Sequence, residues 1–396
     1  MHRRKPTPDY KNRLIILLMT ALAIGTSSHL WLRNDVAPEK TLTTTVEPKP
    51  AKPTIYPKLY SDTHITQNAI VTDERFANSV VYSGESQVAS VLSSISVQTN
   101  KPTSRALESG TWLWTPIMEI TPKYRNSIIS GARKNGIKNI YLSIDSYLDI
   151  FIMPDGVAKD AKKKAFDAVI EGFIKEARKN GITVDAEGGW RNWAEKGNEY
   201  KPFAVLGYAI QYNRTHTEKF RGFQYDVEPY LLDSYKKDKA KVLTNFLTLV
   251  NESVSKLNKS DLTLSVVIPE FYDGSNGETP EFKYLGRTGH AIDHLLTVLD
   301  RRPGSDVIIM AYRNVSFGDN GAIDISADEV STANEHKSRV VIAQETGDFQ
   351  PPYITFHNTS KKYYKRQVSG IEKTLADEKS YGGIATHYIN AYLTLK

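Results

Sequence analysis

The stretch DAVIEGFIKEARKNGITVDAEGG, residues 167–189, contains a helix, a turn and a strand in succession. Apolar residues recur three and four positions apart as far as Ala177, which predicts one amphipathic helix. Asn180 and Gly181 follow, and this pair is a common helix stop because glycine readily takes a left-handed backbone conformation. The residues ITVDA after it are rich in β-branched side chains and indicate a strand.

The same order recurs in residues 125–145, RNSIISGARKNGIKNIYLSID, and eight apolar runs in all lack strict polar alternation. Such runs are typical of parallel strands buried on both faces. Eight of them alternating with helices predict a closed (β/α)8 TIM barrel for residues 106–396. An open doubly wound sheet is the alternative, but WLWTPIMEI after the first run offers no glycine-rich phosphate turn. The eight runs are GTWLWTP (from Gly110), KNIYLSID (from Lys138), ITVDAEGG (from Ile182), GFQYDVEP (from Gly222), DLTLSVVIP (from Asp261), SDVIIMAY (from Ser305), RVVIAQET (from Arg339) and GGIATHYI (from Gly382).

The composition excludes several classes of site. The chain has 396 residues, a net charge of +6 and no cysteine, so disulfides, a thiol nucleophile and a Cys-ligated metal are all absent. Most lysines are scattered along predicted helices, for example Lys159 to Lys164, and indicate solvated helix faces. No P-loop, zinc-knuckle or RNP pattern occurs, so no nucleic-acid partner is expected.

The N-terminus combines a basic segment with an apolar one. Arg13 closes a cluster of basic residues, and the apolar run 14–32 after it is just long enough to cross a bilayer. We expect a transmembrane signal anchor with residues 1–13 in the cytoplasm; a cleaved signal peptide, which would release a secreted protein, is the alternative. Both hypotheses place the remaining chain outside the cytoplasm. Residues 33–105 form a Pro/Thr-rich tether and an extension whose alternating Val and Ser could make a strand pair.

Polar residues gather where the predicted strands end, whereas the strand starts carry almost nothing ionisable of this kind. In a barrel the active site lies at the C-terminal ends of the strands. Buried charges are costly unless they are paired, so a purely structural barrel would not collect acids at one end. The strand-end residues are Asp145, Glu187, Asp226, Glu228, Tyr312, Glu345 and His387.

Asp226 and Glu228 form the most informative pair among them. They are two residues apart, and on one strand they would face the same side. Two carboxylates this close repel when both are ionised, so one pKa should rise and make that group a proton donor near neutral pH. The alternative is that Asp226 pairs with a barrel Lys or Arg and that Glu228 merely caps a loop.

Four segments resemble the chitinase-type family 18 hydrolases. These segments are Ala186–Trp190 (AEGGW), Gln224–Glu228 (QYDVE), Met310–Arg313 (MAYR) and the last strand with His387. They match that family's Ser-x-Gly-Gly, Asp-x-Asp-x-Glu and Met-x-Tyr-Asp motifs in part. The resemblance implies a barrel that cleaves N-acetyl sugars, with Glu228 as acid and with Asp226 and Tyr312 orienting the substrate acetamide. Gln224 and Arg313 each replace an acid of the family pattern, and His387 stands where the family has a tryptophan.

The run Val227-Glu228-Pro229, with Glu345 on the seventh predicted strand, also resembles the large clan of retaining barrel hydrolases. That resemblance implies Glu228 as acid/base and Glu345 as nucleophile, roughly 5–5.5 Å apart. Glu345 could instead pair with Arg191 or Arg313. Val227 replaces the asparagine of the clan's Asn-Glu-Pro motif.

Aromatic and polar residues near the strand ends complete the predicted substrate site. Trp112, Trp114, Trp190 and Trp193 could each offer a face on which a sugar stacks. We also expect substrate contacts from Asp145, Glu187, Arg313 and His387. His290 and His294 have a metal-ligand spacing, but Ala291 replaces the zincin glutamate and their helix should lie outside the barrel, so no metal or cofactor is predicted.

These features together predict a glycoside hydrolase that acts on an oligo- or polysaccharide of the cell envelope or the extracellular space. Its barrel would be a monomer held to the membrane through the N-terminal helix. The alternative hypothesis is a catalytically inactive barrel that binds glycans as a lectin or scaffold. A metal-dependent deacetylase would need a ligand triad that the sequence does not show.

Overall fold

The structure is a computed structural model that describes residues 106–275 and 277–396. The predicted anchor, tether and possible strand pair fall on residues 1–105 and lie outside the described residues. Within the described part of the chain, no helix is both long enough and apolar enough to cross a membrane.

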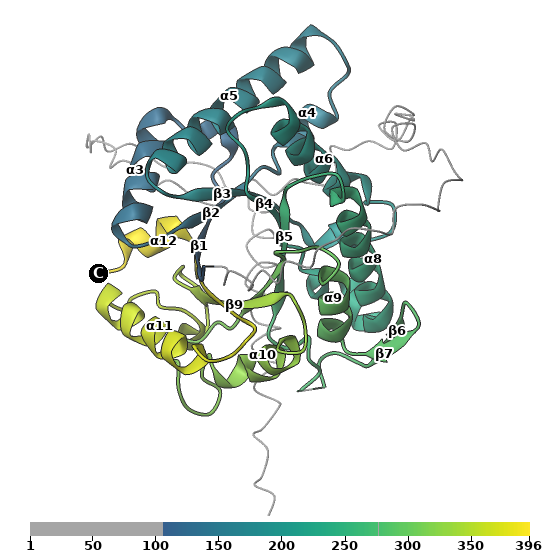
Figure 1. Ribbon diagram of the computed structural model, residues 1–396, viewed down its shortest axis with the longest axis vertical. Coiled ribbons are helices and arrows are strands. Elements are labelled where there is room, and N and C mark those ends of the chain that lie inside the picture. The colour runs from purple at the N-terminus through teal and green to yellow at the C-terminus, as the bar shows by residue number, and fades with distance from the viewer. Residues whose placement is uncertain (1–105, 276) are drawn as a thin grey trace, which may run out of the picture. The chain divides into compact units, whose positions relative to one another are not determined.

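Eight parallel strands form a closed barrel ringed by helices, which confirms the predicted (β/α)8 fold (Figure 1). Each predicted apolar run overlaps one of these strands, and β1 and β10 begin two residues and one residue before their runs. The order around the barrel is β1, β2, β3, β4, β5, β8, β9 and β10, and β10 pairs with β1 to close it. The strands are β1 (Glu108–Leu113), β2 (Asn139–Ser143), β3 (Thr183–Gly188), β4 (Gly222–Tyr225), β5 (Thr263–Pro269), β8 (Asp306–Met310), β9 (Arg339–Glu345) and β10 (Tyr381–His387).

The helices begin and end at residues whose side chains or backbone favour a helix boundary. The first long helix, α3, begins after Thr121, whose side chain accepts a hydrogen bond from the Tyr124 N–H group. The helices α3 and α5 both end before an Asn-Gly pair, and Gly136 and Gly181 take φ angles of 79° and 70° there. The helices are α3 (Pro122–Lys134), α4 (Tyr147–Phe151), α5 (Val157–Lys179), α6 (Tyr200–Thr215), α7 (Asp233–Lys237), α8 (Lys239–Leu257), α9 (Ala291–Leu299), α10 (Ala327–Ala333), α11 (Lys361–Leu375) and α12 (Ile389–Thr394).

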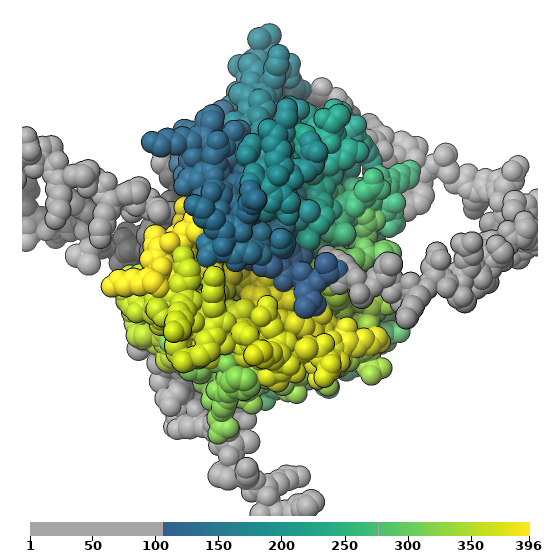
Figure 2. Space-filling view, turned by 60° about the vertical axis from the view of Figure 1, so that its left-hand side comes forward, coloured from purple at the N-terminus to yellow at the C-terminus, as the bar shows by residue number. Residues whose placement is uncertain are grey.

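Two further features complete the architecture. An antiparallel hairpin of β6 (Phe282–Tyr284) and β7 (Arg287–Gly289) lies outside the barrel. Because β1 pairs with β10, the first and last parts of the described chain lie side by side, as the blue and yellow surfaces in Figure 2 show.

Apolar side chains fill two layers. One large cluster joins the strands to the surrounding helices and includes Phe166, Phe173 and Leu295. A smaller cluster consists of strand residues alone and fills the barrel interior. Its buried members are Trp112, Tyr141, Val267, Ile308, Val341, Ala343 and Ala385.

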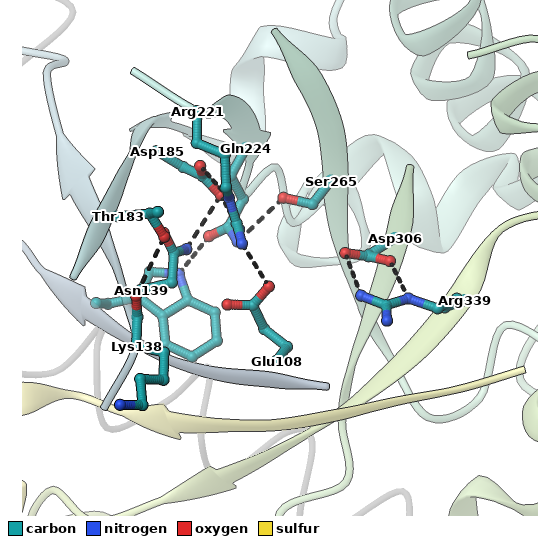
Figure 3. Close-up of polar contacts among 11 residues, drawn as sticks. Glu108, Lys138, Asn139, Thr183, Asp185, Arg221, Gln224, Ser265, Asp306 and Arg339 are labelled. Atoms are coloured by element: carbon teal, nitrogen blue, oxygen red, sulfur yellow. Dashed lines mark hydrogen bonds and ion pairs between the residues drawn. The ribbon is translucent and has the colours of Figure 1, made fainter. Parts of the chain in front are cut away.

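The N-terminal ends of the strands carry a buried ionic network, so the expectation that they carry almost nothing ionisable is wrong. Arg221 lies between two acids, 2.8 Å from Glu108 and 2.6 Å from Asp185 (Figure 3). Asn139 donates a further hydrogen bond to Asp185, and a separate pair joins Arg339 to Asp306. The network was missed because its members come from strands far apart in sequence that meet only when the barrel closes.

The charges of this network compensate one another. Burial works against the charge on Arg221, but Asp185 and Glu108 outweigh that effect and hold the arginine pKa above its usual value. Burial raises the pKa of Glu108, and Arg221 opposes the rise. The ionised groups at this end are therefore partnered by opposite charges, as buried ions in stable structures usually are.

Candidate active site

Two glycines shape the opposite, C-terminal end of the barrel. A Cβ atom added to Gly189 would lie 1.9 Å from the carbonyl oxygen of Asp226, and one added to Gly188 would lie 2.5 Å from Asp145 Oδ1. The Gly189 N–H group donates to Asp145 Oδ2 over 3.3 Å. The segment after β3 can therefore lie directly against both acids only because these positions lack side chains.

We expect the Gly189→Ala substitution to disturb the site. The added methyl group has no room beside the Asp226 backbone, so the segment after β4 must shift, at a cost of about 1–3 kcal/mol in the free energy of unfolding. Urea unfolding and initial-rate measurements would check both effects. Gly172→Ala in α5 is the matched control, because its added methyl group meets only the flexible end of Arg125 and should leave stability equal or higher. Equal behaviour of the two variants would contradict the close packing described here.

Three acids at this end lack a neighbouring cation of the kind found at the other end. One carboxyl oxygen each of Asp145, Glu187 and Asp226 is buried without a hydrogen-bond partner. Burial, with a contribution from Asp226, raises the pKa of Asp145 to about 8. Burial raises the pKa of Glu187 well above its usual value, and Asp145 and Asp226 add to the rise. Burial therefore makes these carboxyl groups bind protons more readily than exposed ones do.

Asp226 and Glu228 lie in the segment after β4, which ends at Tyr225, so they are not both on one strand as predicted. Burial and the neighbouring Glu228 raise the pKa of Asp226 to about 7, while His387 lowers it. Burial also raises the pKa of Glu228, against the effects of Tyr230, His387 and Arg191. Both residues are half-buried, and Oδ1 of Asp226 is itself buried.

Glu345 pairs with His387 and not with Arg191 or Arg313, the partners named as the alternative to its role as nucleophile. The two residues face each other in the register of β9 and β10, and His387 Nδ1 lies 2.5 Å from Glu345 Oε2. The other oxygen, Oε1, accepts a hydrogen bond of 2.5 Å from the Gly347 N–H group. Arg313 instead lies 3.7 Å from Glu270, and the Arg191 guanidinium lies over the Trp190 ring.

The tryptophans divide into two groups. Trp112 and Trp193 are buried, so neither offers a face to a sugar, contrary to the prediction. Trp112 points into the barrel and donates a 2.5 Å hydrogen bond to Gln224, the residue that replaces an acid of the chitinase-type motif. Trp114 and Trp190 are partly exposed, and the Trp114 ring stacks on Tyr388 with centroids 5.4 Å apart.

Three residues at this end were not predicted. Tyr230 donates a short hydrogen bond to Glu228, Tyr388 stacks on Trp114, and Glu270 pairs with Arg313. Tyr230 lies two residues beyond Glu228, so the same short spacing that singled out Asp226 could have found it. Tyr388 and Glu270 also follow strand ends, which was the signal available for them.

The histidines of the α9 segment have structural roles. His294 is buried, with Nε2 3.0 Å from the carbonyl oxygen of Phe282, and His290 precedes the first turn of α9. In residues 106–275 and 277–396 no group of three or more acidic or histidine side chains could hold a metal ion.

No protein-family model and no curated protein sequence matches this chain. Its fold is similar to an endo-1,4-beta-D-mannanase from Thermotoga petrophila RKU-1, with 12% identity, a TM-score of 0.47 and coverage of 71% of this chain and 87% of that chain. It is also similar to the endo-1,4-beta-mannanase from Rhizomucor miehei, with 11% identity, a TM-score of 0.47 and coverage of 71% of this chain and 85% of that chain. A D-psicose 3-epimerase from Clostridium cellulolyticum H10 resembles it with 13% identity, a TM-score of 0.40 and coverage of 71% of this chain and 85% of that chain. These likenesses concern the fold alone, so any function must be argued from the site.

Proposed function

We propose that this protein is a glycoside hydrolase in which Glu228 protonates the leaving glycosidic oxygen of an oligo- or polysaccharide. The observation that carries the proposal is the contrast between the two ends of the barrel. The acids of the N-terminal network are paired with arginines, whereas Asp226 and Glu228 are partly exposed and have raised pKa values. Glycosidases typically use two carboxyl groups, one protonated to act as the acid and one ionised.

The geometry favours Asp226 over Glu345 as the second carboxylate. Glu345 is 1% exposed, and both of its oxygens are held, one by His387 and one by Gly347. Asp226 has one oxygen without a hydrogen-bond partner and is partly exposed. As Glu228 gives its proton to the leaving oxygen and the C1–O bond breaks, Asp226 would orient a substrate acetamide, with Tyr312, to stabilise the positive charge at C1.

We therefore expect Asp226→Asn to lower kcat by about 10²-fold or more, because the neutral amide cannot support that charge. Glu345→Ala should also be weakly active, but azide should not restore its activity, since Glu345 forms no covalent bond to the sugar. Initial rates with and without azide, and a search for a glycosyl azide product, would check this. Formation of that product by the Glu345 variant would make Glu345 the nucleophile.

The proposed activity itself is tested with the full-length chain and a panel of chromogenic glycosides, N-acetylated oligosaccharides and envelope polysaccharides. Release of chromophore or of new reducing ends supports hydrolysis. Saccharide binding in calorimetry without turnover on any member would favour the glycan-binding alternative. Preference for N-acetylated over deacetylated substrates would support the role given to Asp226.

The setting of the reaction is part of the proposal. The basic segment and apolar run at the N-terminus support a protein anchored in a membrane, with its barrel outside the cytoplasm. Envelope or extracellular polysaccharides would be the substrates within reach. Fractionation of cells that produce the full chain, followed by protease accessibility of the barrel, would check this placement.

A further inference from the structure

We propose that Glu345 and His387 act as a positioning pair, in which Glu345 keeps the imidazole of His387 protonated and fixed so that its positive charge faces Asp226 and Glu228. The inference deepens the proposed function and rests on it. Neither residue is assigned a bond to substrate. The pair acts through the carboxyl groups of Asp226 and Glu228, which contact the substrate in the proposed function.

The geometry leaves this pair little freedom. The side chains of His387 and Glu345 are 9% and 2% exposed, and His387 Nδ1 lies 2.5 Å from Glu345 Oε2, an ion-pair contact without hydrogen-bond geometry. Gly347 holds the second oxygen of Glu345. Thr346 donates two hydrogen bonds to the carbonyl oxygen of His387, from its N–H group over 2.7 Å and from its hydroxyl over 2.6 Å. Both the backbone and the side chain of His387 are thus fixed from β9.

Five aromatic rings lie near the imidazole, and three of them, Trp112, Trp114 and Tyr388, meet it in a T-shaped arrangement. His387 is 7% exposed, so little water reaches it. In a site with little water the charge acts strongly on its neighbours. The ring centroids lie 4.5 Å (Trp114), 5.5 Å (Trp112, Tyr312 and Tyr388) and 6.3 Å (Phe349) from that of His387.

The charges agree with this arrangement. Burial alone would lower the pKa of His387, but Glu345 raises it above the usual value, and Asp226 and Glu228 contribute in the same direction. Conversely, His387 lowers the pKa of both Asp226 and Glu228 against the effect of burial. The ionisable groups that act on the imidazole are Glu345, Asp226 and Glu228, and the rings of two further ionisable residues, Tyr312 and Tyr388, pack near it.

This charge has a clear use in general acid catalysis. The reaction requires that Asp226 and Glu228 together keep one proton, whereas burial favours two. A fixed cation beside them makes loss of the second proton easier. The pair would therefore set the pH at which the catalytic carboxyl groups reach their working state.

The test is the pH profile of kcat/KM for the full-length protein and its variants Glu345→Gln and His387→Gln. Each substitution removes the positive charge, so the pKa values of Asp226 and Glu228 rise. We expect the acidic limb to move to higher pH by about one unit in either variant, with no further shift in the double variant. His336→Gln is the control. His336 Nδ1 lies 2.8 Å from Asp300 Oδ2, and this pair is separate from Asp226 and Glu228. The pH profile of the control variant should not move. If Glu345→Gln and His387→Gln were less active but the acidic limb of their pH profiles did not move, the pair would have only a packing role and the proposal would be overturned.

A second measurement needs no substrate. Imidazole NMR signals of His387, assigned by their loss in His387→Gln, can be titrated in the full-length protein and in Glu345→Gln. We expect a lower imidazole pKa in the variant, because its carboxylate partner is gone. An unchanged pKa would overturn the pairing whatever the protein hydrolyses. A lowered pKa in a protein that cleaves no glycoside would keep the pair and reject the proposed function.

Discussion

Glu228→Gln is expected to lower kcat on natural glycosides by about 10²–10⁴-fold with the fold unchanged. The amide has nearly the size and shape of the carboxyl group, and its oxygen can still accept the hydrogen bond from Tyr230. It cannot give up a proton to the leaving oxygen. Initial rates on the best substrate of the panel, with binding followed by calorimetry, would show a loss in turnover and little change in affinity.

The leaving group supplies the internal control for this variant. An aryl glycoside whose phenolate leaves without protonation does not need a general acid, so Glu228→Gln should lose far less activity on it. Asp226→Asn should lose activity on both kinds of substrate, because the charge at C1 develops in either case. Equal losses of Glu228→Gln on both substrates would contradict the role of Glu228 as proton donor.

Arg221→Met is expected to lower the free energy of unfolding by about 3–5 kcal/mol. The change leaves Glu108 and Asp185 buried without their cation at the N-terminal end of the barrel. Urea unfolding of the full chain would measure the effect. The matched control is Arg178→Met, because the Arg178 side chain is 68% exposed and water screens its pair with Glu218, so this variant should keep nearly all of its stability.

The pH dependence of the Arg221 variant separates charge from packing. Without Arg221 the folded-state pKa of the two acids should lie above the unfolded values, so the protonated form is favoured in the native protein. Stability is then retained at acidic pH and lost as the pH rises through those raised values. The deficit relative to wild type should shrink as the pH falls toward 4. A deficit that does not vary with pH would indicate lost packing.

The barrel could be predicted because its signals are local. Each strand is a short β-branched run, and Asn180-Gly181 and Asn135-Gly136 mark helix ends with a backbone geometry that glycine favours. The polar residues at the strand ends followed from the same pattern, since parallel strands bring their C-terminal ends together.

The pairings within the barrel could not be predicted in this way. Glu345 meets His387 because of the register between β9 and β10, which no local pattern encodes. Trp112 belongs to the cluster inside the barrel, and Arg221 bonds Glu108 across 113 positions of sequence. The partners of a residue depend on how the barrel closes, so Glu345 and His387 could be predicted at the strand ends, whereas their contact and the network of Arg221 could not.

The direction in which β1 begins has a practical consequence. Glu108 opens that strand beside Arg221, so the polypeptide enters the barrel at the end opposite Asp226 and Glu228. A carrier protein joined at Ala106, where the described chain begins, would therefore be attached at the end of the barrel opposite the acids. Under the proposed function, a fusion at that position should leave the ratio of activity on large and small substrates unchanged.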